Sequence, residues 1–514
     1  MSERRGGLVR AVVVVGLILL VFLVVGLVFV GPGRDRDEPG GNGDGGGRGE
    51  VALTLLQLND VYELTPVSGG AEGGLARVAA VRKQYLDRNP NTFTFLAGDL
   101  LNPSALSTAT VDGERLAGRQ MVDVMNAVGL DYATFGNHEF DLAEDAFRAR
   151  LAESEFTWFS SNVSEANGEP FPGVPRNVVF DVEGEGGAEA TVGLFGVTVA
   201  SNPLPWVQYG DPIEAARRQV AELRGKVDIL IAVTHLLVED DVRLVQELPE
   251  IDLVLGGHEH ENNSLERGAD FTPILKADAN ARSMQVHELV YDTEDRELTH
   301  EAELRRITSD DPDDPEVAAQ VDRWVQAAFE GFRSQGFEPE RVVTRTTEDL
   351  DGRESTVRNQ PTRLAELIAN GMTRSAGSAE LAMFNAGSIR IDDVIPAGDV
   401  TEYDVIRTLP FGGTVLGADM SGDLLRQVLD QGRANAGIGG YLQTANVTFT
   451  DQWLVNGAPV DPARTYRVAI NDFLLSGREF RLDFLTRDRV ANITEHGDIR
   501  EGFIAELEAT YGSP

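Results

Sequence analysis

From Val51 onward, short apolar runs alternate with longer runs that have the spacing of helices. The short runs are rich in Val, Leu, Ile and Phe, which is typical of buried strands. Strands that alternate with helices in this way indicate an α/β fold. The expected strands are 51–58, 92–98, 132–135, 190–198, 227–234 and 251–257, with an outer strand at 284–292, and the expected helices include 74–88, 114–128 and 212–224.

The acidic sequence DDPDD at 310–314 interrupts this pattern. A helix-like run at 315–335 follows it, and we assign residues 311–339 to a linker helix. The interruption predicts a larger first domain at 51–310 and a smaller α/β or α+β domain at 340–514. The second domain is expected to contain helices at 361–374 and 420–432 and strands at 380–385 and 466–471.

An uninterrupted apolar run fills residues 11–30, and a helix of about this length crosses a bilayer. Three arginines within residues 1–10 precede it, which places that end in the cytoplasm. A cleaved signal peptide is the alternative, although its apolar region is usually shorter and ends at small residues, unlike the sequence FVGPG here. Residues 31–50 are rich in glycine and predict a flexible tether. We expect a single-pass anchor in the lipid bilayer with both domains outside the cytoplasm, or a secreted protein if residues 1–30 are removed.

The formal net charge of −38 excludes some partners. Such a surface repels nucleic acid polymers, and it would also repel a small phosphate ester unless a local cation reverses the field. The chain has no cysteine, which excludes disulfides, thiolate metal sites and cysteine nucleophiles.

Residues that bind metals or move protons follow five of the expected strands. Ligands of open α/β sheets bind beyond the carboxyl ends of the strands, so these residues should meet in one crevice. Oxygen donors mixed with imidazoles suit Mn, Fe, Zn, Co or Mg, and seven donors fit two ions better than one tetrahedral ion. The residues are Asp60, Asp99, Asn137, His138, His235, His258 and His260.

The segment Gly136–Asp141 combines an amide, an imidazole and two carboxylates directly after a short strand. Asp141 is three residues beyond His138 and can hold the second ring nitrogen of that imidazole. Taken alone, the segment is also compatible with an ordinary polar turn. The remaining histidines, His287, His300 and His496, have no comparable setting and are expected to be ordinary surface residues.

Several motifs resemble those of the calcineurin-like metallophosphoesterases, and the C-terminal part resembles the C-terminal domain of the 5'-nucleotidase family. The first set is NDVYE (59–63), GDLLNPS (98–104), GNHEFD (136–141), THL (234–236) and GGHEH (256–260). The second set is VRNQPTRLAELIANG (357–371), NAGSIR (385–390), LPFGG (409–413) and NDFLLSG (471–477).

The resemblance implies a four-layer sandwich that binds two divalent metal ions, such as Mn, Zn or Co, and a second domain that holds the nucleoside. It further implies that Asp99 bridges the ions, that His138 and Asp141 form a catalytic dyad, and that two arginines bind phosphate. Carried over by motif position, the metal ligands are Asp60, Asp99, Asn137, His235, His258 and His260, and the substrate-binding residues are Arg358, Asn385, Arg390 and Phe411.

Two positions depart from the family pattern. Tyr62 stands where the first motif usually has a histidine, so it either packs in that space or binds the first ion. The usual Gly-Gly-Asp-Gly-aromatic segment is replaced by Gly477-Arg478-Glu479-Phe480, which leaves the role of Phe480 in base stacking open.

These features predict an extracytoplasmic, metal-dependent phosphoesterase that hydrolyses nucleotides to nucleoside and phosphate. The alternatives are a cyclic-nucleotide or nucleotide-sugar diphosphate hydrolase, and a membrane-anchored binding protein whose metal site has decayed. The expected partners are a small nucleotide or phosphate-ester substrate and the lipid bilayer, and the sequence does not fix the oligomeric state.

Overall fold

The computed structural model describes residues 49–200 and 204–513. The predicted N-terminal segment 1–10, the anchor at 11–30 and nearly all of the tether at 31–50 therefore lie outside the described residues. Among the residues that are described, no helix is both long enough and apolar enough to cross a membrane.

The first domain contains two six-stranded sheets. The first sheet has the order β16-β15-β1-β2-β5-β6, and the second has the order β13-β14-β12-β11-β9-β8. The strands of the first sheet are β1 (Glu50–Leu58), β2 (Thr92–Ala97), β5 (Tyr132–Thr134), β6 (Thr157–Phe159), β15 (Ser283–Asp292) and β16 (Glu297–Arg306). Those of the second are β8 (Asn177–Glu183), β9 (Glu189–Thr198), β11 (Ile229–His235), β12 (Leu253–Gly256), β13 (Asn263–Arg267) and β14 (Thr272–Lys276).

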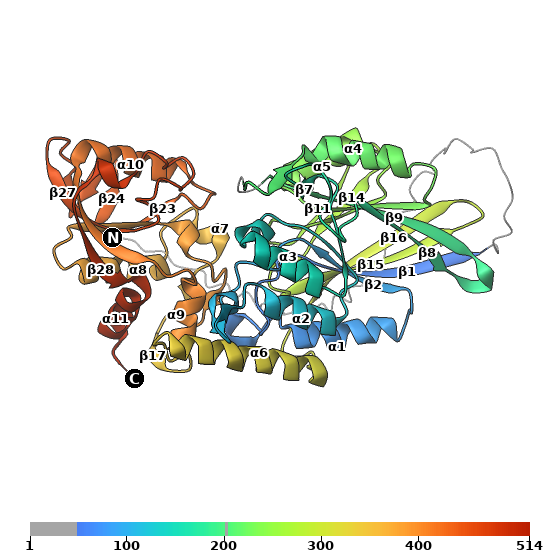
Figure 1. Cartoon of the computed structure of the whole chain (residues 1–514), viewed down its shortest axis with the longest axis horizontal. Helices are drawn as coiled ribbons and strands as arrows, with labels where there is room; N and C mark the ends of the chain where they lie inside the picture. Colours follow the sequence, from blue (N-terminus) through green and yellow to red (C-terminus); the bar gives the residue numbers. More distant parts are fainter. Residues whose placement is uncertain (1–48, 201–203, 514) are drawn as a thin grey trace, which may run out of the picture. The chain divides into compact units, whose positions relative to one another are not determined.

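The two sheets pack face to face, and helices cover their outer faces, which gives the expected four layers (Figure 1). Apolar residues of β1 and β2 contact those of β9, β11 and β12 to form the inner core. On the outer face of the first sheet lie α1 (Leu75–Leu86), α2 (Arg119–Val128) and α3 (Glu144–Glu153). On the outer face of the second sheet lie α4 (Pro212–Leu223) and α5 (Val238–Glu247).

Two expectations for this domain differ from the structure. The helix predicted at 114–128 begins at Arg119, because the residues before it form the short hairpin of β3 (Thr110–Val111) and β4 (Glu114–Arg115). The strand predicted at 284–292 is not an outer strand, since β15 pairs with both β1 and β16. The edge is β16, in which half of the side chains are charged and all are at least partly exposed, as suits the edge of a sheet.

The linker helix is α6 (Pro315–Ser334), and its first turn is capped by the side chain of Asp314. Its buried side chains, including Val317 and Phe332, belong to the same core as α1 and α2. The helix therefore extends the packing of the first domain.

The second domain is built on a five-stranded sheet with the order β23-β19-β27-β22-β28. Helices α8 (Arg363–Ala376) and α11 (Ile499–Tyr511) contribute to the core on one face, and α10 (Gly422–Ala434) contributes to the core on the other. The strands are β19 (Leu381–Asn385), β22 (Thr414–Ser421), β23 (Leu442–Ala445), β27 (Thr465–Asn471) and β28 (Ala491–Asp498).

Polar contacts join the second domain to the first. The carboxylate of Asp393 accepts hydrogen bonds from the backbone N–H of Ser68 at 2.8 Å and from its hydroxyl at 3.1 Å. Nε of Arg407 lies 3.0 Å from Oε1 of Glu63, and both side chains are largely buried. These contacts bring the loop after β1 against the second domain.

Candidate metal and phosphate site

The predicted metal-binding residues lie on loops that follow strands of both sheets. Asp60 follows β1, Asp99 follows β2 and Asn137 follows β5, all in the first sheet. His235 ends β11, and His258 with His260 follows β12, in the second sheet. The residues meet as the sequence predicts, but because two stacked sheets supply them rather than the edge of one sheet, they approach from two sides.

Asp60, Asp99 and His235 form the buried centre of this group, and one ligand atom of each lies within 4.8 Å of the others. Nε2 of His235 lies 3.3 Å from Oδ2 of Asp99 and 3.9 Å from Oδ1 of Asp60. Two carboxylates and an imidazole at this spacing are a typical donor set for a divalent transition metal.

An amide and a second imidazole extend the group on one side. Oδ1 of Asn137 lies 3.2 Å from Nε2 of His235 and 3.1 Å from Nδ1 of His258. The backbone N–H of His258 donates to Oδ2 of Asp60 at 2.9 Å. Asn137, His235 and His258 thus face one another as potential metal ligands, next to the carboxylates of Asp60 and Asp99.

His260 and Tyr62 extend the group on the other side. Nε2 of His260 lies 3.5 Å from Oδ1 of Asp60. The hydroxyl of Tyr62 lies 2.9 Å from Oδ2 of Asp99, to which its one proton can be donated, and it lies 3.2 Å from Oδ1 of Asp60 and 3.4 Å from Nε2 of His260. The phenol therefore points into the donor group and contacts its members directly, instead of only packing at the mouth of the cleft.

The donor group suits cations because it places two buried carboxylates close together. Asp60 and Asp99 are both fully buried. Among the described residues, the ion pairs of these carboxylates involve histidines and no lysine or arginine. Two buried carboxylates this close together are unfavourable unless positive charge, from a protonated histidine or from a bound cation, lies beside them.

The ionisation of the histidines follows from the same geometry. Burial lowers the pKa of His235, but the charges of Asp99 and Asp60 outweigh it and raise that pKa to about 9. Burial, and then the neighbouring His235, lower the pKa of His258 to about 3. Without a metal ion, His235 therefore carries a proton at neutral pH that partly balances the two carboxylates, whereas the imidazole of His258 is neutral.

His138 and Asp141 form the predicted dyad. Nδ1 of His138 donates to Oδ2 of Asp141 at 2.6 Å, and the amide of Asn102 donates to the same oxygen at 3.3 Å. The backbone N–H of His138 donates to Oδ1 of Asp99 at 2.8 Å. The imidazole is therefore oriented by Asp141 and tied to the donor group through the main chain.

The backbone at these loops has little tolerance for change. Asp60 has φ 53°, Asp99 has φ 60° and His258 has φ 83°, a region in which residues with side chains are strained. A Cβ added at Gly136 would lie 2.1 Å from Oδ1 of Asp99. Glycine at this position lets the loop after β5 approach that carboxylate.

The sequence analysis missed Glu139, which joins two of the loops. Its fully buried carboxylate accepts backbone N–H groups from Gly136 and Leu100, each at 2.6 Å, and from Asp99 at 3.2 Å. Burial, and then the charge of Asp99, raise the pKa of Glu139 to about 7. Its position inside the GNHEFD motif is the sequence feature from which its importance could have been predicted.

Lys276 was also missed, and it joins the loops of the second sheet. Its buried Nζ donates to the backbone oxygens of Leu236 at 2.7 Å and Gly257 at 2.8 Å. It also pairs with Oδ2 of Asp241 at 2.8 Å and with the carboxylate of Glu259. Leu236 and Gly257 are the chain neighbours of His235 and His258, so Lys276 fixes both loops.

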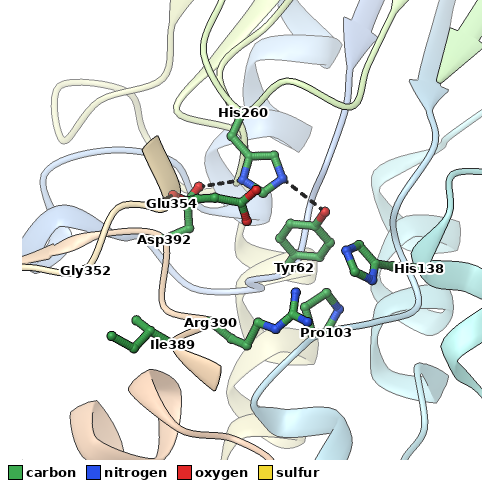
Figure 2. Close-up of a pocket in the computed structure, with 9 residues that line it drawn as sticks. All are labelled: Tyr62, Pro103, His138, His260, Gly352, Glu354, Ile389, Arg390 and Asp392. Atoms are coloured by element: carbon green, nitrogen blue, oxygen red, sulfur yellow. Dashed lines mark hydrogen bonds and ion pairs between the residues drawn. The ribbon is translucent and has the colours of Figure 1, made fainter. Parts of the chain in front are cut away.

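A pocket beside the donor group is lined by both domains (Figure 2). Tyr62, His138 and His260 contribute from the first domain, and Arg390 and Asp392 contribute from the second. Figure 2 shows the guanidinium of Arg390 reaching toward Pro103 and His138. Among the described residues, Nε of Arg390 is buried without a hydrogen-bond partner. Buried polar groups usually have a partner, so this N–H is available to an anion in the pocket.

The other predicted substrate residues have different settings. Arg358 is paired with Glu354, and its pKa is lowered by burial. Asn385 is buried and donates to Glu479 at 2.7 Å, while its oxygen accepts from Asn471 at 3.0 Å. The structure thus places Asn385 in an internal network and not at the metal pocket.

Two aromatic rings near these residues are exposed. Phe411 is 53% exposed and lies with its ring centroid 5.8 Å from Cζ of Arg390. Phe480 is 65% exposed and follows Glu479, the partner of Asn385. Large rings left open to solvent are available for stacking on a ligand.

Known protein families match both domains. The model of the calcineurin-like phosphoesterases matches residues 53–262, and that of the 5'-nucleotidase C-terminal domain matches residues 342–483. Together with the candidate metal and phosphate site, these matches define the chain as a calcineurin-like phosphoesterase, a hydrolase of phosphate esters. With its second domain, it belongs to the 5'-nucleotidase family of nucleotide phosphoesterases.

Individual relatives are similar over most of this chain. The trifunctional nucleotide phosphoesterase protein YfkN of Bacillus subtilis is 27% identical over 83% of this chain, which spans 32% of that larger protein. The snake venom 5'-nucleotidase of Naja atra is 24% identical over 84% of this chain and 91% of its own length. The crystal structure of the 5'-nucleotidase precursor from Thermus thermophilus superposes with a TM-score of 0.73 at 25% identity, covering 90% of this chain and 97% of that one.

Proposed function

We propose that this protein hydrolyses nucleoside monophosphates to nucleoside and phosphate at the pocket between Tyr62, His138 and Arg390. The observation that supports this most is the meeting of the His138–Asp141 dyad, the donor group and the unpartnered Nε of Arg390 in one pocket. Proton transfer, cation binding and anion binding are the three abilities that phosphoester hydrolysis requires.

The donor group fits two divalent cations, for which Mn, Zn and Co are our candidates. Asp60, Asp99 and His260 would hold one ion, and Asp99, Asn137, His235 and His258 would hold the other, with Asp99 shared. Such ions neutralise phosphoryl oxygens and lower the pKa of water. Their charge also reverses, at the site itself, the negative field that a protein with a net charge of −38 would present to the substrate.

The residues of the chain then have separate roles. Arg390 and Arg358 bind phosphate or leaving-group oxygens with their planar guanidinium groups. For Arg358 this requires exchanging its present partner, Glu354. In its doubly protonated form, His138 gives the proton of Nε2 to the departing alkoxide, while Asp141 accepts the hydrogen bond of Nδ1 and fixes the ring.

A substrate panel with the purified full-length protein tests the proposal. The protein is stripped with a chelator, reloaded with Mn, Zn or Co, and assayed with nucleoside monophosphates, cyclic nucleotides, nucleotide sugars and p-nitrophenyl phosphate. We expect metal-dependent release of phosphate from monophosphates. A preference for cyclic nucleotides or nucleotide sugars would favour the alternative hydrolases, and failure to bind metal would favour a non-catalytic binding protein.

His138→Ala tests the proposed role of His138 in proton transfer. We expect kcat to fall by roughly 10²–10⁴, the usual contribution of a positioned acid or base. Metal content should hardly change, because His138 is not assigned as a ligand. Asp99→Ala should instead lose at least one ion and nearly all activity.

Phe411→Ala tests whether a base is recognised. If the exposed ring stacks on a nucleobase, that contact is worth roughly 1–3 kcal/mol. KM should then rise for nucleotides and stay unchanged for p-nitrophenyl phosphate. An equal loss on both substrates would assign Phe411 to folding, and Phe480→Ala examines the second exposed ring in the same way.

We further propose that the domains function outside the cytoplasm, tethered through residues 11–30. Two observations support this: the apolar run with its preceding arginines, and the similarity to a 5'-nucleotidase of snake venom. The proposed organisation is a catalytic domain at 51–310, a linker helix at 311–339 and a substrate-binding domain at 340–514.

A further inference from the structure

The second domain reaches into the proposed metal site through one carboxylate. Oδ2 of Asp392 accepts a hydrogen bond from Nδ1 of His260 at 2.8 Å, and Figure 2 shows His260 between Asp392 and the hydroxyl of Tyr62. The other ring nitrogen, Nε2, faces Asp60 at 3.5 Å. A carboxylate that accepts from one nitrogen of a histidine fixes the tautomer and presents the lone pair of the other nitrogen.

Asp392 is itself held firmly. Its Oδ1 accepts from the backbone N–H of Glu354 at 2.7 Å, and its backbone oxygen accepts from the guanidinium of Arg282. Its φ of 39° lies in the left-handed region, which a residue with a side chain occupies when surrounding contacts require it. The side chain is largely buried. These restraints fix the carboxylate against His260.

The same carboxylate adjoins the phosphate-binding residues. Arg390, which reaches into the pocket, is two residues before Asp392, and Glu354, whose N–H binds Asp392, pairs with Arg358. The orientation of His260 therefore depends on the loop that carries Arg390 and on the backbone of Glu354, the partner of Arg358.

We propose that Asp392 is a positioning residue for metal binding, so that the substrate-binding domain completes the metal site of the catalytic domain. The inference rests on the proposed function, because it assumes that His260 binds a metal ion. It assigns the second domain a role in metal affinity in addition to substrate recognition.

Asp393 provides a matched control. It is the next residue, is also buried and also joins the domains, but its carboxylate binds Ser68, Arg282 and Arg407. Asp392→Asn and Asp393→Asn therefore each remove one buried carboxylate charge from the same interdomain contact. Asparagine also tolerates the left-handed backbone at position 392.

The experiment is a titration of the stripped full-length protein with Mn²⁺, followed by electron paramagnetic resonance and calorimetry. In Asp392→Asn we expect one class of site to weaken by about 10- to 100-fold, the usual effect of removing such a support, with the other class unchanged. Asp393→Asn should leave both classes as in the wild type. At saturating Mn²⁺, Asp392→Asn should recover most of its kcat.

A double-mutant cycle with His260→Ala separates this role from a general effect on folding. If Asp392 acts through His260, adding Asp392→Asn to His260→Ala should cause no further loss of affinity. Equal weakening in Asp393→Asn, or full affinity in Asp392→Asn, would overturn the inference. Asp392→Ala repeats the titration should the asparagine variant not fold. A wild type that takes up no Mn²⁺ would overturn the proposed function itself.

Discussion

Tyr62 is the residue at which this site differs most from the family pattern. Burial, and then the charges of Asp99 and Asp60, raise its pKa well above 10, so the phenol stays protonated at neutral pH. A protonated phenol is a poor ligand, so the proposed ion site of Asp60, Asp99 and His260 would be one donor short. We predict that Tyr62→His tightens metal binding there by roughly tenfold or more, as measured by metal titration.

Tyr62→Phe is the control for that change. It removes the hydroxyl that donates to Asp99 and adds no donor, so metal affinity should not reach that of Tyr62→His. A wild-type protein that is fully loaded, indifferent to added metal and coloured by a band that Tyr62→Phe abolishes would show that Tyr62 is a ligand.

At the scale of single residues, the sequence predicted which side chains meet in the candidate metal site, but not the buried residues that hold their loops in place. Asp60, Asp99 and His235 could be recognised because polar residues that end apolar strands stand out locally. Lys276 ends an apolar strand as well, but a single lysine there has no distinctive neighbour. Its partners come from distant segments, so their meeting depends on tertiary packing.

Among the elements, the loops after β11 and β12 depend on Lys276. Lys276→Met would leave the carboxylates of Asp241 and Glu259 without their buried cation and would free two backbone oxygens. We predict a loss of about 3–5 kcal/mol in the free energy of unfolding, measured with denaturant. Lys83→Met, which removes a mostly exposed lysine paired with Asp314, should have a far smaller effect.

The first sheet contains a histidine pair that the sequence analysis wrongly assigned to the surface. His287 is fully buried, with Nε2 2.9 Å from Oε1 of Gln57 and Nδ1 3.0 Å from Nε2 of His300. The prediction failed because it treated β15 as an outer strand, whereas β16 covers that edge and carries His300.

This pair should make the fold sensitive to acid. Burial, and then the neighbouring His300, lower the pKa of His287 well below its ordinary value near 6.5. The unfolded chain therefore binds a proton more readily, and stability is lost as the pH falls below about 6.5. In His287→Gln, the free energy of unfolding should fall less steeply between about pH 7 and 5.

At the scale of the whole molecule, the order of the helices and strands could be predicted from the sequence. The arrangement of the layers could not be derived from the periodicity of the apolar residues. Strands such as β2 and β11 have clear apolar runs, and helices such as α1 and α4 lie close to their predicted bounds. The division into two stacked sheets came from the family resemblance, because a run of apolar residues does not reveal which sheet it joins.

The proposed tether makes a prediction about location. In cells that produce the full chain, added protease should cut within residues 31–50 and release an active fragment. The activity should sediment with membranes before the treatment and become soluble after it. Activity that is soluble without protease would show that residues 1–30 are removed as a signal.

The contact between His260 and Asp392 joins positions that are 132 residues apart in the chain. A ribosome adds residues in order, and domains generally fold as they emerge. The histidine is therefore synthesised well before its acceptor, and the first domain can fold while the loop containing Asp392 is still absent. Full metal affinity would then arise late in synthesis, which delays an active nucleotide hydrolase until the chain is nearly complete.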